Sequence, residues 1–196
     1  MNNNRIKEVM EPIINEIKEQ FVKVAESEIK ASYLLSDLSN KINLLLPYYN
    51  NALTFYLNDL YSFNINEQSV VIFGHDLGGY FGLDKKDGTI GHLIEDNGKL
   101  KVRFCNSDIN QFICFNNLFL CMVNKIINNE ISDNSFDSFI ETLETFFSDI
   151  NKQALLKEDN YWSERVYELS DGFFPLGDER IKFYENLKRS ASDENA

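Results

Sequence analysis

The sequence predicts an α+β protein in which a twisted antiparallel sheet, a meander, is flanked by N- and C-terminal helices. Two observations support this prediction. Apolar residues recur every three or four positions before residue 67 and again after residue 106, which is the spacing of one helix face. Between these positions, short β-branched and aromatic runs alternate with turn signals, a pattern typical of antiparallel strands.

The first third of the chain is expected to be helical. The spacing predicts one helix over about residues 12–31 and a second one that begins near Leu34. Pro47 interrupts the second pattern, which resumes at Tyr48 and continues to Leu60. The apolar positions that predict the first helix are Val9, Met10, Ile13, Ile14, Ile17, Phe21 and Val24.

The predicted sheet begins after Glu67. Its strands contain the runs SVVIFG, YFGLD, TIGHLIE and KLKVRFC in that order. Asn97-Gly98 separates the last two runs and predicts a tight type I′ hairpin turn, because both central residues of that turn need positive φ.

Helical spacing returns after Asn106, and Ser107 is expected to cap the first helix of this part. Further helices are predicted over 136–150, over 160–169 and over 177–188. The whole chain, residues 1–196, is therefore expected to form a single domain, with an additional N-terminal helix within 1–32 and a disordered tail over 190–196.

The charge of the chain limits its partners. The 196 residues carry a formal net charge of −12, with a pI near 4.6. Such a surface repels phosphate backbones and anionic lipid, so we expect no direct binding to nucleic acid or membrane, whereas a basic protein is a suitable partner. The chain shows neither a long apolar run nor a signal peptide, and we expect it in the cytoplasm.

The three cysteines agree with a reducing compartment. Cys105, Cys114 and Cys121 are odd in number, lack CxxC spacing and lie among Phe, Ile and Leu, so we expect reduced, buried thiols. We expect no metal and no cofactor. Asp84 and Asp87 precede Gly88 but do not fit the register of a calcium loop.

The stretch GHDLGG, residues 74–79, raises the question of an aspartate nucleophile at Asp76. A nucleophile elbow leads from a strand into a helix and needs a late histidine, but a β pattern follows these glycines and the two histidines are His75 and His92. The favoured interpretation is a structural glycine turn or bulge in a sheet. Trp162 is interpreted as a core anchor or, alternatively, as the lining of a groove.

The order of these features resembles the SUKH superfamily, whose members include bacterial immunity proteins and yeast cell-wall regulators. Four short motifs carry the resemblance across about residues 35–175. They are Gly78-Gly79-Tyr80-Phe81-Gly82-Leu83-Asp84, Asp87-Gly88-Thr89-Ile90, Phe104-Cys105-Asn106-Ser107 and the later Phe112. Leu46-Pro47-Tyr48-Tyr49 upstream and Tyr161-Trp162-Ser163 downstream are also similar to segments of that family.

The resemblance implies a non-enzymatic protein that binds and neutralises a secreted bacterial toxin, often a nuclease. A strongly acidic binder would associate quickly with a basic toxin domain. The partner-binding residues are expected in the region 76–87, at Asp76, Tyr80, Asp84 and Asp87. The alternatives are a regulatory or scaffolding module of the same superfamily without a toxin partner, and the aspartate-nucleophile hydrolase.

Overall fold

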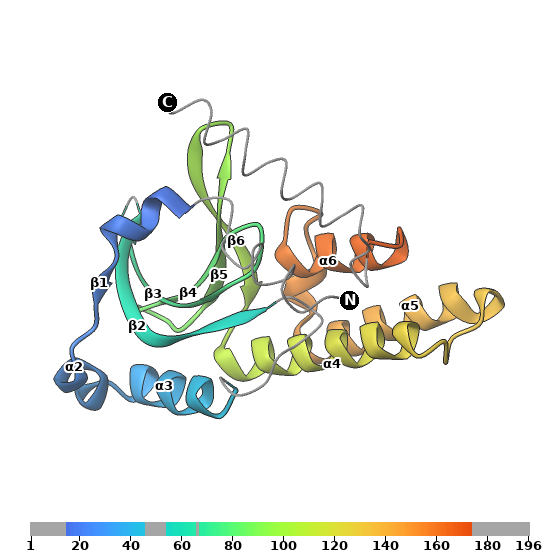
Figure 1. Ribbon diagram of the computed structural model, residues 1–196, viewed down its shortest axis with the longest axis horizontal. Helices are drawn as coiled ribbons and strands as arrows, with labels where there is room; N and C mark the ends of the chain where they lie inside the picture. Colours follow the sequence, from blue (N-terminus) through green and yellow to red (C-terminus); the bar gives the residue numbers. More distant parts are fainter. Residues whose placement is uncertain (1–14, 46–53, 66, 174–196) are drawn as a thin grey trace.

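The computed structural model describes residues 15–45, 54–65 and 67–173, and it has the expected α+β architecture. Six strands form one antiparallel sheet in which spatial order follows sequence order (Figure 1). The strands are β1 (Val22–Lys23), β2 (Phe55–Ile65), β3 (Gln68–His75), β4 (Tyr80–Asp84), β5 (Ile90–Asp96) and β6 (Lys99–Asn106). The helices are η1 (Asn15–Gln20), α2 (Glu26–Ala31), α3 (Tyr33–Leu45), α4 (Ile109–Ile127), η2 (Asp133–Ser135), α5 (Phe136–Asn151), η3 (Lys152–Leu155) and α6 (Tyr161–Ser170).

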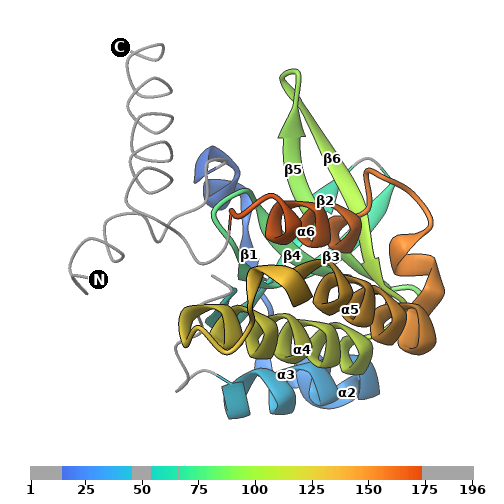
Figure 2. The same ribbon diagram turned by 90° about the vertical axis from the view of Figure 1, so that its right-hand side faces the viewer.

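The sheet is covered differently on its two faces because successive side chains of a strand point to opposite sides. One face packs against α3, α4, α5 and α6 and forms the larger core (Figure 2). Phe73, Phe81 and Leu83 belong to this core. The other face carries a smaller cluster that includes Phe63, Ile72, Tyr80 and Leu93, together with Ile17 from η1.

The N-terminal segment corrects the prediction of one helix over 12–31, of which residues 15–31 are described. Instead of a helix, the chain forms η1, then β1 at the edge of the sheet, then the short α2. Val22 and Lys23 pair with β2, and the Val24 N–H donates to the Leu60 carbonyl oxygen at 2.9 Å. Ile17 therefore packs on one face of the sheet and Val24 on the other.

The second correction concerns residues 55–60, for which the spacing predicted a continuation of helix. They begin β2, an 11-residue strand that pairs with β3 at both ends, with a register shift between Tyr56 and Tyr61. The first part of the prediction is confirmed, since α3 runs from Tyr33 to Leu45. The sheet thus begins well before Glu67. The predicted interruption of the helical pattern at Pro47 lies outside the described residues.

The helices after the sheet follow the prediction closely. The predicted helices over 136–150 and 160–169 correspond to α5 and α6, while the helix over 177–188 and the tail over 190–196 fall outside the described residues. Asp108, and not Ser107, caps α4, because its carboxylate accepts a hydrogen bond from the Gln111 N–H at 3.0 Å. The Ser107 hydroxyl instead accepts a hydrogen bond from Asn151 Nδ2.

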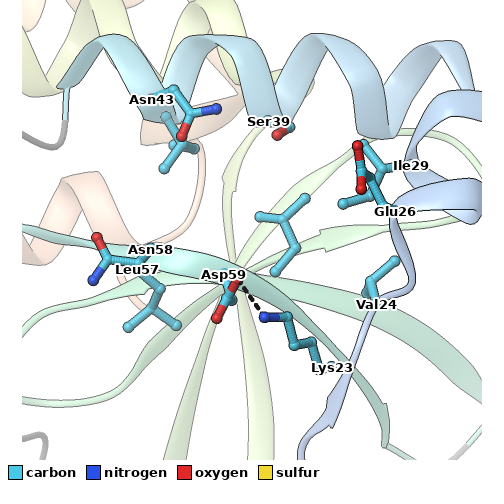
Figure 3. Close-up of a pocket in the computed structure, with 11 residues that line it drawn as sticks. Lys23, Val24, Glu26, Ile29, Ser39, Asn43, Leu57, Asn58 and Asp59 are labelled. Carbon is cyan, nitrogen blue, oxygen red and sulfur yellow. Dashed lines mark ion pairs between the residues drawn. The ribbon is translucent and has the colours of Figure 1, made fainter.

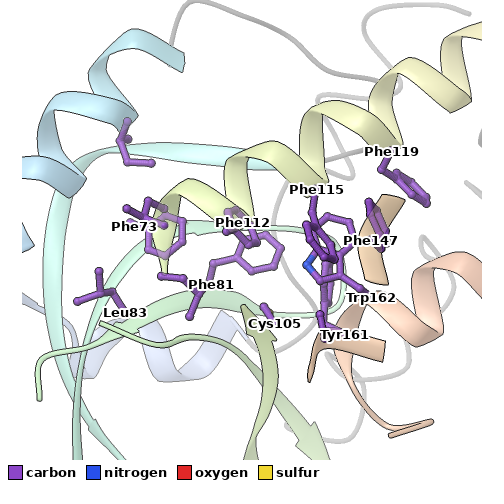
Figure 4. Packing of buried hydrophobic residues seen from close by; sticks show 14 of the residues in the cluster. Phe73, Phe81, Leu83, Cys105, Phe112, Phe115, Phe119, Phe147, Tyr161 and Trp162 are labelled. Atoms are coloured by element: carbon purple, nitrogen blue, oxygen red, sulfur yellow. The ribbon is translucent and has the colours of Figure 1, made fainter. Parts of the chain in front are cut away.

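Trp162 is a core residue and not a groove residue. Its ring lies against four phenylalanines from α4 and α5, and its Nε1–H donates to Asn106 Oδ1 at 2.7 Å (Figure 4). The same core holds Cys105, as expected. Cys114 and Cys121, however, are exposed on α4, so the prediction of three buried thiols is wrong for these two.

Candidate functional site

The region 76–87, where partner-binding residues were expected, divides into a buried half and an exposed half. Residues 76–79 connect β3 directly to β4, so the chain passes from strand to strand with no helix. The Asp76 N–H donates to the Gly79 carbonyl oxygen at 3.0 Å, and the Asp76 Oδ1 atom accepts from the N–H groups of Gly78 and Gly79 at 2.8 and 2.9 Å. This is the geometry of a glycine turn that a local carboxylate holds together, not that of a nucleophile elbow.

Gly79 is needed in this turn for close approach. A Cβ atom on Gly79 would lie 1.9 Å from the Leu93 carbonyl oxygen, a distance that the two backbones cannot accommodate. The bulge that we expected here occurs earlier, between Ile72 and Gly74, where the β3–β4 register shifts. The prediction of a structural glycine is therefore confirmed for Gly79, and the turn and the bulge are separate features.

Asp76 is the centre of a buried charge network. Its Oδ1 atom lies 2.9 Å from His92 Nε2 on β5, and its Oδ2 atom accepts a hydrogen bond from the Arg165 guanidinium on α6 at 2.6 Å. The Asp76 side chain is 1% exposed and that of Arg165 is 11% exposed. The Arg165 guanidinium also lies over the Tyr161 ring and pairs with Glu168. This network joins the sheet to the last described helix.

Two opposing effects act on the pKa of Asp76. Burial favours the neutral acid, but the charges of His92 and Arg165 and the hydrogen bond from the Gly79 N–H outweigh it, so the pKa is lowered below its ordinary value. Asp76 is thus an ionised carboxylate enclosed by donors. The structure thus places Asp76 in the interior, where its carboxylate faces the protein and not the solvent, and its expected role in partner binding stays a prediction.

Tyr80, the second residue expected to bind a partner, is also buried in the structure. It is 2% exposed and belongs to the smaller core cluster. The Phe21 ring packs edge-on against it, with ring centroids 4.9 Å apart. Tyr80 therefore fixes the N-terminal segment to the sheet.

Asp84 and Asp87 form the turn between β4 and β5. Asp84 is half-buried, and its Oδ1 atom accepts from the Lys86 N–H at 2.8 Å. Asp87 is exposed, and its Oδ1 atom accepts from the Thr89 N–H at 2.9 Å, a bond that lowers the pKa of Asp87. Both residues have a turn-forming role, and both also leave a carboxylate accessible to a partner.

A second acidic surface, on α5, was not singled out from the sequence. The 16 residues of α5 include Asp137, Glu141, Glu144 and Asp149 but no lysine or arginine. All four carboxylates are exposed, and within the described part of the chain none of them has a basic nitrogen within 4.0 Å. Many other acidic side chains are paired, for example Glu28 with Lys85 and Asp59 with Lys23.

The signal for this surface was present in the sequence. Asp137, Glu141 and Glu144 recur at the i, i+4 and i+7 positions of one helix, so they lie along one side of it. Like charges at such spacing cost about 0.2–0.5 kcal/mol per pair in an isolated helix. The helix carries these charges without a lysine or arginine of its own to offset them. We call Asp137, Glu141 and Glu144 the α5 acidic stripe.

Three hollows lie among residues 15–45, 54–65 and 67–173 of the structure. One of about 280 Å³ lies between β2 and the α2–α3 pair, and the Lys23–Asp59 ion pair, 2.8 Å long, occupies its floor (Figure 3). A second of about 440 Å³ lies along α4 and includes Cys121. A third, of about 180 Å³, lies on the sheet between β3, β4, β5 and β6 and includes Asp84.

Within the described ranges, no three His, Cys, Asp or Glu side chains are grouped as metal ligands. The same part of the chain contains no helix with the length and hydrophobicity needed to cross a membrane.

Fold and site together define an α+β protein with a buried charge network and an unpaired acidic helix face. Comparisons with protein families, with curated proteins and with solved structures give no match to this chain.

Proposed function

We propose that the chain is an acidic binding protein of the SUKH type, an immunity protein that occludes a basic cognate toxin domain. The observation that carries the proposal is the α5 acidic stripe, three exposed carboxylates without cations on a protein of net charge −12. Complementary charge speeds the encounter of two proteins and discriminates against wrong partners. A basic nuclease domain, which must itself attract a phosphate backbone, fits this stripe.

The buried state of Asp76 supports binding over the hydrolase alternative. A nucleophilic carboxylate must reach a substrate atom, whereas the Asp76 oxygens accept from two backbone N–H groups and contact His92 and Arg165. These polar contacts of the Asp76 carboxylate point inward, to the β3–β4 turn, to the sheet and to α6. The network is suited to holding a binding surface rigid.

The test is a rescue assay in cells. The chain is co-expressed with the C-terminal domain of the protein encoded immediately upstream, and surviving cells are counted against a control without the chain. We expect rescue. If that domain is toxic and survival is unchanged, the immunity proposal fails for this neighbour, and the scaffolding alternative becomes the better one.

A pair of matched variants tests the α5 acidic stripe by measuring the association rate of the purified chain with that toxin domain. The triple variant Asp137→Asn, Glu141→Gln and Glu144→Gln removes three charges from the stripe. The control triple, Glu67→Gln, Glu95→Gln and Glu158→Gln, removes the same charge from exposed positions elsewhere. We expect the stripe variant to lower the association rate by about tenfold or more at low salt, and the control to change it much less. Equal effects of the two triples would contradict the stripe as the contact surface.

A further inference from the structure

The hollow on the sheet has a composition that distinguishes it from the other two. A pair of glycines, Gly82 on β4 and Gly91 on β5, lie opposite each other in the strand register and line it. Neighbouring side chains lean over both glycines, since an added Cβ atom would lie 2.4 Å from Val102 Cγ1 at Gly91 and 3.2 Å from Leu93 Cδ1 at Gly82. Val70 and Val102 lie next to these glycines and also line the hollow.

Asp84 is the charged group of this hollow. Its carboxylate lies on the same face as Gly82, two residues earlier on β4, and no basic residue lines the hollow. One Asp84 oxygen, Oδ1, is used by the Lys86 N–H, while Oδ2 has no partner among the described residues. Phe104, half-buried, adds an aromatic ring to the lining.

The size of the hollow limits its occupant. A small-molecule or cofactor site usually has about 300–1,000 Å³. This hollow has about 180 Å³, which is room for one long side chain. A side chain with an aliphatic stem and a cationic head matches both the apolar walls of the hollow and its single carboxylate.

We propose that this hollow is an anchor pocket for one arginine side chain of the partner protein. The aliphatic stem packs against the two valines, and the guanidinium pairs with Asp84 Oδ2. Arginine is preferred over lysine because its planar head also stacks on an aromatic ring such as Phe104. Buried arginines surrounded by weaker contacts often dominate a protein interface.

The proposal goes beyond the α5 acidic stripe, because the hollow lies on the opposite face of the sheet from α5, and it rests on the proposed function for the identity of the partner. Its test does not need the toxin, because the side chain itself serves as the probe. N-acetyl-arginine amide is titrated into the ¹⁵N-labelled chain at constant ionic strength, and backbone amide shifts are followed. N-acetyl-citrulline amide, of the same shape but neutral, is the control probe.

We expect saturable shifts at Gly82, Gly91 and Val102 with the arginine probe and much smaller ones with the citrulline probe. Asp84→Asn keeps the side-chain oxygen that the Lys86 N–H needs but removes the charge, and we expect it to weaken binding about three- to tenfold. Asp87→Asn, on the same turn but outside the hollow, is the matched control and should bind as the wild type does.

Three results would overturn the anchor pocket: shifts that map elsewhere, equal binding of the two probes, or equal binding of wild type and Asp84→Asn. None of them would affect the rescue assay, which measures partner binding as a whole. Conversely, failed rescue with specific arginine binding would leave the pocket in place and point to a partner other than that toxin.

Discussion

The guanidinium of Arg165 donates a hydrogen bond to the Asp76 carboxylate at 2.6 Å, across 89 residues of sequence. This contact connects the β3–β4 turn to α6 inside the protein. Because both groups are almost fully enclosed, the free energy of each depends on the presence of the other.

The first prediction concerns Asp76→Asn. The substitution keeps the size of the side chain but removes the fully buried acidic partner of Arg165 and leaves Glu168 as its remaining one among the described residues. Breaking a buried ion pair costs about 3–5 kcal/mol. We expect a loss of this order in the free energy of unfolding, measured by urea denaturation. The exposed variant Asp87→Asn is the control, and we expect it to change stability by less than about 1 kcal/mol. A similar value for both variants would contradict a stabilising role for the network.

The second prediction is the pH dependence of stability. The pKa of Asp76 is lowered in the folded protein, so between that value and its unfolded value, about 3.9, the unfolded chain binds more protons than the native one. The stability from the ionised form is therefore fully present above about pH 4 and is lost as the pH falls further. Urea denaturation across the acid range should show that the stability difference between wild type and Asp76→Asn shrinks with acidification. A stability difference that stays constant with pH would contradict a lowered pKa of Asp76 in the folded protein.

The third prediction compares two adjacent glycines. Gly79→Ala forces a Cβ atom against the Leu93 carbonyl oxygen, and we expect it to destabilise the protein by more than about 2 kcal/mol. Gly78→Ala is the matched control, because its Cβ would have only ordinary contacts, the nearest at 3.5 Å from Asp76 Oδ1. Thermal unfolding followed by circular dichroism measures both. Equal unfolding midpoints for the two variants would show that the backbone can shift to accommodate a Cβ atom at position 79.

The fourth prediction concerns thiol reactivity. Cys114 and Cys121 are exposed on α4, whereas Cys105 is buried and its pKa is raised, first by burial and then by the Asp76 charge. A thiol-specific chromogenic reagent should titrate two groups rapidly in the native protein and the third only in denaturant. Three rapid groups in the native state would mean that the core around Cys105 opens readily.

The sequence was informative where local pattern and tertiary role agree. Asn97 and Gly98 both adopt positive φ, 53° and 71°, as the turn signal predicted, and α5 begins and ends within a residue of its expected bounds. In these places the backbone preference of each residue and its burial point to the same structure.

The helix predictions from apolar spacing were wrong where the apolar residues of one segment pack on two different faces of the sheet. Ile17 and Val24 match a helix face, yet they pack on opposite faces of the sheet, because the chain crosses its edge at Val22 and Lys23. In β2, Tyr56 and Leu60 also have helical spacing, but a half-buried strand places apolar residues on both sides. No local pattern indicates that Asp76 pairs with Arg165, because the contact depends on how α6 docks.

The late position of Arg165 affects how the chain matures during translation. Each strand of the sheet pairs only with strands adjacent in sequence, so the ladder can assemble as the nascent chain leaves the ribosome. Asp76 emerges early but acquires its counter-ion only after α6 has been synthesised. A nascent chain that ends before α6 therefore lacks the Arg165 partner of Asp76, and we expect it to reach full stability only after α6 has been synthesised and has docked.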